Sequence, residues 1–388
     1  MPFYHKLGDI PRVKHTTFYK KDGKSLYREE LYSSKGFSGI YSNKYYIHMP
    51  TSVESVREIK PFADAAWPDA PVLYFHFFTD KKVTKGDFIS SRNLFLKNAH
   101  CRISTAHPSQ DTDRFFRNAY HAELVFIHRG TGKFVSEYGQ IPFVEGDQII
   151  IPRAVTYQLK FDSYADNKIV IVESSTAYEV PRKYRTDYGQ ILEDAPYCER
   201  DFKLPEYMTP HDESGKFVVV LKAGERYFEH TLPWHPFNVV GWDGYLYPFA
   251  FNIKDYHPKV GRIHLPPPVH LAFNTGHFIV CNFVPRPYDF HPNAVPAPYF
   301  HSNIDSDEVL YYIDGDFMSR TGVVSGSITL HPGGMPHGPQ PGRTEASVGA
   351  KETKEWALMI DTYEPLVPTI HVKETVDPAY AQSWLGGD

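Results

Sequence analysis

The sequence predicts an almost entirely β-structured protein made of two packed, strand-rich domains. Aromatic residues make up 15% of its 388 residues, with 27 Tyr and 27 Phe, and aromatic side chains favour strands. The chain also contains 32 Pro and 26 Gly, which interrupt segments with turns and leave room for only a few short helices. Because the chain is too long for one small core, we expect two domains.

Six apolar or alternating segments are predicted to be strands, and Gly, Pro, Asp and Asn separate them. They span residues 70–78, 122–130, 146–152, 167–174, 216–224 and 277–285. The best helical candidate is short, at 53–66. Strands at regular spacing favour antiparallel sandwiches or barrels.

A Tyr-, Arg-, Pro- and Asp-rich stretch at roughly 176–215 predicts a long connection between the strand-rich halves. We therefore expect an N-terminal domain at 1–215 that includes this connection, and a C-terminal domain at 216–388.

Composition excludes several classes of function. The hydrophobic share of 41% and the charged share of 22% are ordinary for a globular protein. A net charge of -5 gives no electrostatic case for binding nucleic acid or an anionic membrane. The three cysteines are widely spaced and suggest neither a disulfide framework nor a CxxC metal site. The first residues lack the apolar core of a signal peptide, so we expect a cytoplasmic protein.

Two segments near the C-terminus carry a spaced set of metal-ligand residues. In 297–316, Glu308 follows His301 by seven residues, and Gly315 follows Glu308 by seven. In 326–339, the spaced residues are Gly326, Pro332, Gly334 and His337. These spacings resemble the two halves of the conserved pattern of the cupin β-barrel, with Asn303 at the position of its second histidine.

The loss of that histidine defines the kind of metal site. Side chains alternate faces along a strand, so a barrel can direct His301, Glu308 and His337 toward one point. Two imidazoles and one carboxylate form a facial triad, which leaves positions on Fe(II) open for substrate and O₂. Asn303 is an alternative contact to the ligands or to the substrate.

The first half of the chain contains a degenerate copy of the same pattern. Glu123 precedes Gly130 by seven residues, but Phe116, Asn118 and Tyr157 stand at the histidine positions. A lone carboxylate does not hold iron. We therefore expect a double cupin whose N-terminal barrel is structural and whose C-terminal barrel holds the metal.

The C-terminal half also resembles homogentisate 1,2-dioxygenase, in the segments 241–256, 262–273, 298–316 and 330–339. The resemblance covers about the last 150 residues well and the N-terminal half only in architecture. It implies Fe(II) on His301, Glu308 and His337, and O₂-dependent opening of homogentisate to maleylacetoacetate in tyrosine and phenylalanine breakdown. It also implies a homo-oligomer, either a trimer or a hexamer.

The same resemblance assigns further site residues. His264 falls on an acid/base histidine that would accept the phenol proton, and His331 on a histidine that would hydrogen-bond the substrate or an intermediate. Phe317 occupies the position where animal members carry a Tyr that holds the substrate carboxylate, which makes Arg286 an alternative cation. Tyr299 and Asn303 flank the first ligand and are candidate substrate contacts.

Purely structural roles remain open as alternatives for these histidines. His264 precedes three prolines and could cap a rigid loop, and His331 stands beside Pro332 and could be turn surface. His270 and His277 are expected in the core or in a cavity wall, and His291 in a loop.

Three other functions also remain open. They are cleavage of gentisate or a hydroquinone, a metal-binding cupin isomerase that needs no O₂, and a non-enzymatic double cupin.

Overall fold

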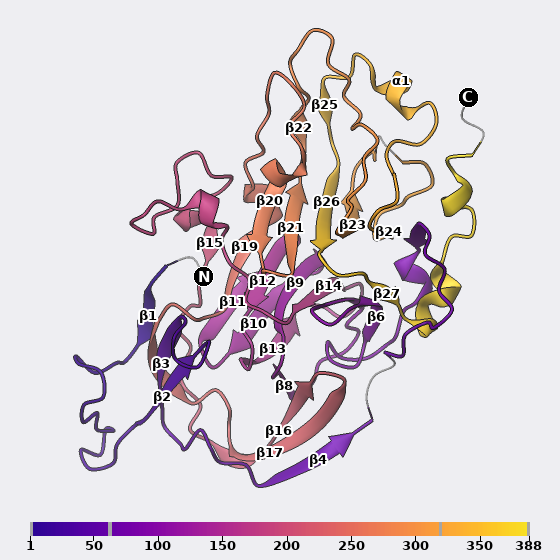
Figure 1. Cartoon of the computed structure of the whole chain (residues 1–388). Coiled ribbons are helices and arrows are strands. Elements are labelled where there is room, and N and C mark those ends of the chain that lie inside the picture. Colours follow the sequence, from indigo (N-terminus) through magenta and orange to yellow (C-terminus); the bar gives the residue numbers. More distant parts are fainter. Residues whose placement is uncertain (1–2, 61–63, 318–319, 386–388) are drawn as a thin grey trace.

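Strands account for nearly all regular structure in the computed structural model, which describes residues 3–60, 64–317 and 320–385 (Figure 1). Within those ranges the only α-helix is α1, Arg343–Ser347, and the other helical segments are single 3₁₀ turns or little longer. No helix in the described part of the chain has the length and hydropathy needed to cross a bilayer.

Two large sheets form the first barrel. One has the strand order β15 (Phe202–Lys203), β19 (Phe249–Asn252), β12 (Asp147–Ile151), β9 (Ala122–Arg129), β14 (Lys168–Ser174), β7 (Cys101–Ala106), β6 (Arg92–Lys97) and β27 (Val367–Pro368). The other has the order β11 (Gly139–Phe143), β10 (Gly132–Ser136), β13 (Thr156–Phe161), β8 (Phe115–Asn118), β16 (Ser214–Ala223), β17 (Arg226–Trp234) and β4 (Ser55–Ile59). Phe126 of the first sheet and Phe134 and Tyr157 of the second belong to one buried apolar cluster.

A six-stranded sheet carries the second barrel, above the first in Figure 1. Its order is β20 (Leu271–Asn274), β21 (Phe278–Phe283), β26 (Trp356–Thr362), β23 (Asp307–Asp314), β24 (Ile328–His331) and β5 (Phe75–Phe77). Beyond it lie long loops and the short pair β22 (Arg286–Pro287) and β25 (Glu352–Thr353). The chain is therefore a double cupin.

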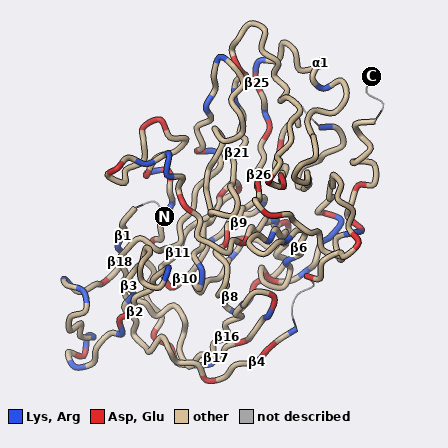
Figure 2. Tube along the Cα trace, viewed as in Figure 1, with Lys and Arg blue, Asp and Glu red and all other residues tan. Residues whose placement is uncertain are grey.

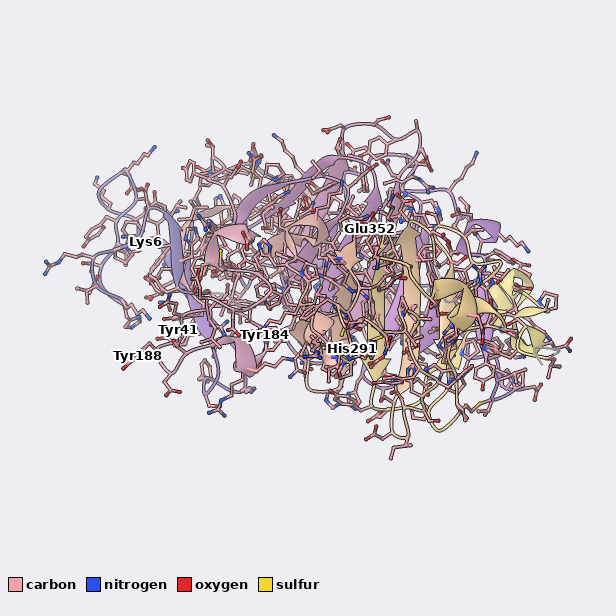
Figure 3. All side chains as sticks on the ribbon, turned by 90° about the horizontal axis from the view of Figure 1, so that it is seen from above. Lys6, Tyr41, Tyr184, Tyr188, His291 and Glu352 are labelled. Atoms are coloured by element: carbon pink, nitrogen blue, oxygen red, sulfur yellow. The ribbon has the colours of Figure 1, made fainter. Side chains whose placement is uncertain are left out.

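A smaller sheet extends the first barrel at its N-terminal side. It consists of β1 (His5–Gly8), β18 (Val239–Gly244), β3 (Tyr41–Tyr46) and β2 (Arg28–Ser33). Lys44 of β3 lies 3.0 Å from the Glu137 carboxylate, and both side chains are buried. Seen from above, Lys6 and Tyr41 lie on this side, whereas His291 and Glu352 lie over the second barrel (Figure 3).

Strand pairing does not break at residue 215. Strands β16 and β17 join a sheet of the first barrel, and β19 pairs with β12. Two strands also cross the other way. The early strand β5 pairs with β24 of the second barrel, and the late strand β27 pairs with β6 of the first. The division at 215 stays a prediction, and the pairing favours a second barrel that starts after Asn252.

The predicted strands are found at 75–77, 122–129, 147–151, 168–174, 214–223 and 278–283. The predicted helix at 53–66 is wrong, because its first part forms β4, which pairs with Tyr227–Thr231 of β17. Tertiary pairing at a sheet edge overrides a weak helical pattern. Residues 61–63 of that segment lie outside the described residues.

The long connection at 176–215 contains only the 3₁₀ turns η2 (Arg182–Tyr184) and η3 (Glu199–Asp201), the short β15 and the start of β16. Its tyrosines fix it to the second barrel. The Tyr184 hydroxyl donates to the Leu271 carbonyl at 2.9 Å, and the Tyr197 hydroxyl to the Ala272 carbonyl at 2.6 Å.

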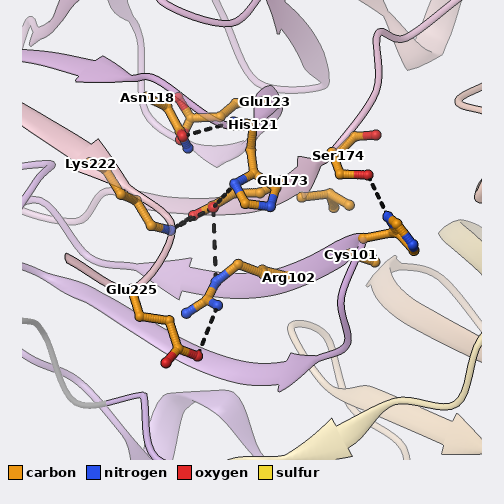
Figure 4. Close-up of polar contacts among 12 residues, drawn as sticks. Cys101, Arg102, Asn118, His121, Glu123, Glu173, Ser174, Lys222 and Glu225 are labelled. Atoms are coloured by element: carbon orange, nitrogen blue, oxygen red, sulfur yellow. Dashed lines mark hydrogen bonds and ion pairs between the residues drawn. The ribbon is translucent and has the colours of Figure 1, made fainter.

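Acidic and basic residues are scattered over the whole trace (Figure 2). The first barrel also contains a buried charge cluster around Glu173, which contacts Lys222 directly and lies 4.0 Å from Arg102 and 3.9 Å from His121 (Figure 4). Burial alone would raise the pKa of Glu173, but the neighbouring cations Lys222, Arg102 and Arg92 lower it to about 2. The carboxylate is therefore ionised inside the barrel.

Candidate metal centre and substrate cavity

Glu308 is placed by the central strand of the second barrel. It lies on β23 directly opposite His331 of β24 on one side and Asp361 of β26 on the other. Residues directly opposite in an antiparallel pair present their side chains on the same face of the sheet. The sheet therefore presents one carboxylate between an imidazole and a second carboxyl group.

His301 and His337 face each other across a separate antiparallel bridge. The His301 amide donates to the His337 carbonyl at 2.9 Å, and the His337 amide donates to the His301 carbonyl at 2.8 Å. Nδ1 of each ring lies near a backbone carbonyl, at 3.2 Å from Tyr299 for His301 and at 3.0 Å from Met335 for His337. Donation to a carbonyl places the proton on Nδ1, so each Nε2 keeps its lone pair.

Both free nitrogens lie near the Glu308 carboxylate. Nε2 of His301 is 3.6 Å from Oε2, and Nε2 of His337 is 3.5 Å from Oε1. The three potential ligand atoms all lie within 4.8 Å of one another. Nε2 of His337 is buried and has no hydrogen-bond partner. A buried, unpaired acceptor beside a carboxylate and a second imidazole fits a bound cation, so the residues present suit a metal ion.

The charge state of Glu308 supports the same arrangement. Burial alone would raise its pKa, but the three neighbouring imidazoles of His301, His331 and His337 lower the pKa well below its usual range. The carboxylate is therefore available as an anionic ligand at neutral pH.

His331 contacts Glu308 through one ring nitrogen and Tyr380 through the other. Nδ1 lies 2.8 Å from Oε1 of Glu308, and Nε2 lies 3.0 Å from the Tyr380 hydroxyl. The side chain is fully buried, so the turn-surface alternative is wrong. Burial lowers the pKa of His331 to about 4, so the neutral ring donates from Nδ1 to the carboxylate. This geometry gives His331 a positioning role and leaves neither nitrogen for the substrate.

A cavity of about 400 Å³ opens beside the three converging residues, and His301 and Glu308 line it. That volume suits a small organic ligand. Among the expected substrate contacts, those in its wall are His264, Arg286, Tyr299 and Asn303. The Asn303 side chain makes no hydrogen bond with the described residues.

His264 meets the cavity from the loop before the 3₁₀ turn η5, Pro267–His270. Nδ1 lies 3.4 Å from the Asp289 carboxylate, and the ring contacts Tyr299 edge-on at 4.9 Å between centroids. One-third of the side chain is exposed. An imidazole held by a carboxylate and open to a cavity can accept a proton at its other nitrogen.

Phe317 does not line the cavity. It is buried and packs edge-on against Tyr312 at 4.7 Å, so a Phe here gives no polar group to a substrate. Arg286 does line the cavity, and its guanidinium lies 3.8 Å from the Glu355 carboxylate.

The remaining histidines of this half differ in burial and in their position relative to the cavity. His270 is buried in the cavity wall, and burial lowers its pKa to about 3. His291 is partly exposed and absent from that wall. His277 is not a core residue, because it lies half-exposed in the turn between β20 and β21.

Sequence reasoning missed Asp289, Asp361 and Tyr380. Asp361 lines the cavity, and its Oδ1 is buried without a partner. Burial and the nearby Glu308 raise the pKa of Asp361 well above its usual range. A polar residue inside the apolar run WALMID was an available signal, but spacing alone could not pair it with Glu308.

In the first barrel, the Arg92 guanidinium lies among the residues that stand at the metal-ligand positions of the cupin pattern. Nη1 of Arg92 is 2.7 Å from the Glu123 carboxylate, and Nη2 donates to the Tyr157 hydroxyl at 2.9 Å. The same guanidinium stacks over the Phe116 ring at 4.3 Å. A protein cation thus neutralises Glu123 where no histidine is available to hold a metal.

Two strand barrels, the second with three converging potential metal ligands beside a cavity, define the chain as a double cupin with a candidate metal centre. A family model described as homogentisate 1,2-dioxygenase N-terminal matches residues 95–253. A Saccharolobus solfataricus protein described as a putative dioxygenase is 41% identical over 99% of both chains. The chain belongs to the homogentisate 1,2-dioxygenase family.

More distant relatives carry the name of the same family. Homogentisate 1,2-dioxygenases of Bradyrhizobium diazoefficiens and of Rhodopseudomonas palustris (strain BisA53) are each 27% identical, over 84% of this chain and 74% of theirs. Among solved structures, a cupin 2 conserved barrel domain protein from Leptotrichia buccalis covers 74% of this chain and 96% of its own, with a TM-score of 0.33 and 9% identity. The family match covers much of the first barrel, where the sequence had indicated only a shared architecture.

Proposed function

We propose that this chain is a non-haem Fe(II)-dependent dioxygenase that opens the ring of homogentisate with O₂ to give maleylacetoacetate. One ring carbon–carbon bond breaks, and both oxygen atoms of O₂ enter the product. The observation that carries the proposal is the convergence of His301, His337 and Glu308 beside a ligand-sized cavity, in a member of this family.

These three residues would hold the iron, which when bound supplies a Lewis acid and redox centre with open coordination positions. His331 keeps Glu308 ionised and oriented through its 2.8 Å contact. The apolar wall formed by Phe283, Leu310 and Met359 limits water around the reacting groups.

His264 accepts the phenol proton at Nε2 in this proposal. Asp289 stabilises the imidazolium that forms, because its carboxylate lies 3.4 Å from Nδ1. We expect His264→Ala to lower kcat by about 10²- to 10⁴-fold while the iron content stays unchanged. Steady-state O₂ consumption and metal analysis of the same samples check this. Unchanged turnover in the iron-loaded variant would show that another group is the base.

Arg286 is the proposed partner of the substrate carboxylate. It is a cation in the cavity wall, and Phe317 offers no hydroxyl there. We expect Arg286→Met to raise KM for homogentisate by about tenfold or more, because a hydrogen bond to a charged group contributes about 1.5–3 kcal/mol. KM for unsubstituted hydroquinone, if it is turned over, should not change. An equal effect on both compounds would contradict the assignment.

The proposed function is tested by anaerobic loading with Fe(II), followed by O₂ uptake with homogentisate, gentisate or hydroquinone. We expect uptake with homogentisate and the ultraviolet absorbance of a ring-opened product, and neither in Glu308→Gln. Uptake with gentisate or hydroquinone alone would overturn the substrate assignment. No uptake with any of the three would favour a metal-binding cupin that does not use O₂.

A further inference from the structure

Outside the cavity, three turns from distant parts of the chain bring together a second set of metal-ligand side chains. His100 lies in the turn between β6 and β7, His277 in the turn between β20 and β21, and Glu364 just after β26. One ligand atom of each residue lies within 4.8 Å of the other two. None of the three lines the proposed substrate cavity.

The contacts of His100 leave one nitrogen directed at the carboxylate. Nδ1 lies 2.7 Å from the Ser175 hydroxyl, and Nε2 lies 3.2 Å from Oε1 of Glu364. An outer hydrogen bond at one imidazole nitrogen that orients the other is the usual arrangement around a metal-binding histidine.

Hydrogen bonds to backbone carbonyls fix the turns to one another. The Tyr363 amide donates to the His277 carbonyl at 3.0 Å, and the Asn98 side-chain amide donates to the Glu364 carbonyl at 2.8 Å. The positions of the three ligand residues are therefore held by the two barrels together.

The His277 ring can adjust to an ion. It stacks on His100 with 3.6 Å between ring centroids and an 8° angle between the ring planes. Its nitrogens make no hydrogen bond with the described residues, and the residue is half-exposed. An ion lies close to the plane of each imidazole that binds it, so loading requires this ring to turn out of the stack.

We propose that His100, His277 and Glu364 form a second site for a divalent transition-metal ion such as Zn²⁺, independent of the catalytic centre. Two imidazoles and one carboxylate suit this class of ion, with water completing the coordination. Because His100 belongs to the first barrel and His277 and Glu364 to the second, the ion stabilises their contact.

The test uses the full-length chain carrying His301→Ala and His337→Ala, so that the candidate catalytic centre no longer binds metal. After equilibrium dialysis against Zn²⁺ near neutral pH, we expect about one equivalent of bound zinc and a raised thermal midpoint. Addition of His277→Ala should lower bound zinc to below about one-tenth of an equivalent and abolish the thermal shift.

A matched control is available in another histidine stack. The His211 and His235 rings lie 3.9 Å apart, and Glu213 lies 3.2 Å from Nδ1 of His211, but this trio is not among the described groups whose ligand atoms converge. His211→Ala in the same background should retain the zinc and the thermal shift.

Two results would overturn the proposal: no zinc in the background variant, or zinc retained after His277→Ala. His277→Gln serves as a second variant if the alanine variant does not fold. Because the readouts are metal content and thermal midpoint, failure here is separate from failure of the ring-cleavage proposal.

Discussion

At the residue scale, the candidate centre depends on groups that fix each imidazole as much as on the ligands themselves. Backbone carbonyls hold Nδ1 of His301 and His337, and Tyr380 together with Glu308 holds His331. Such outer contacts determine which nitrogen faces the metal.

We expect His331→Phe to weaken Fe(II) affinity by about 10- to 100-fold, because Glu308 loses the donor that orients it. Competition with a chelator, followed by iron analysis, measures the affinity. His291→Ala is the control and should bind iron normally, since His291 is outside the cavity wall. Normal affinity in His331→Phe would contradict the positioning role.

The sequence predicted the three converging residues because their spacing follows strand and turn geometry. It could not predict Asp361 or Tyr380, which reach Glu308 and His331 through strand register and a C-terminal 3₁₀ turn. It also assigned His331 to the substrate, because spacing carries no information on which nitrogen is already bonded.

At the element scale, the two barrels share strands and buried polar contacts. The predicted strands are found because alternating apolar segments bury one or both faces. β4 was mistaken for a helix, since its pairing with β17 is not visible in local sequence. The exchange of β5 and β27 between the barrels was equally unpredictable, because both strands are very short.

Arg92, at the start of β6, is expected to stabilise the first barrel. Arg92→Met leaves Glu123 and Tyr157 buried without a cation, which should lower the free energy of unfolding by about 3–5 kcal/mol. Urea unfolding measures the change. Arg92→Met combined with Glu123→Leu should recover much of the loss, because no unpaired charge then remains. A single variant as stable as the parent chain would contradict this role.

His128 of β9 lies where the first barrel meets the second, with Nε2 3.4 Å from the Ser325 hydroxyl. Burial, Lys168 and Arg129 lower its pKa to about 3 from 6.5. Between those values the unfolded chain binds more protons, so stability falls as the pH falls. Burial lowers the pKa in the same direction for His121, His235 and His270.

We therefore expect the free energy of unfolding to fall less steeply in His128→Gln than in the parent chain between about pH 6.5 and about pH 5. The difference in slope should average about 1 kcal/mol per pH unit. Parallel curves for the variant and the parent chain would show that His128 does not contribute.

At the scale of the whole molecule, each barrel contains a buried carboxylate, and the two barrels surround its negative charge with different groups. Glu123 of the first barrel is neutralised by Arg92, whereas Glu308 of the second faces two histidines with free nitrogens. The first barrel thus supplies strands and stability, and the second supplies the candidate centre and its cavity.

The most direct measurement of the central proposal is turnover of homogentisate by the Fe(II)-loaded chain under ¹⁸O₂, with mass analysis of the product. We expect a ring-opened product that carries labelled oxygen in its new carboxylate group, with one O₂ consumed for each homogentisate. A product with an intact ring or with no labelled oxygen, or no consumption of O₂, would contradict the proposed function.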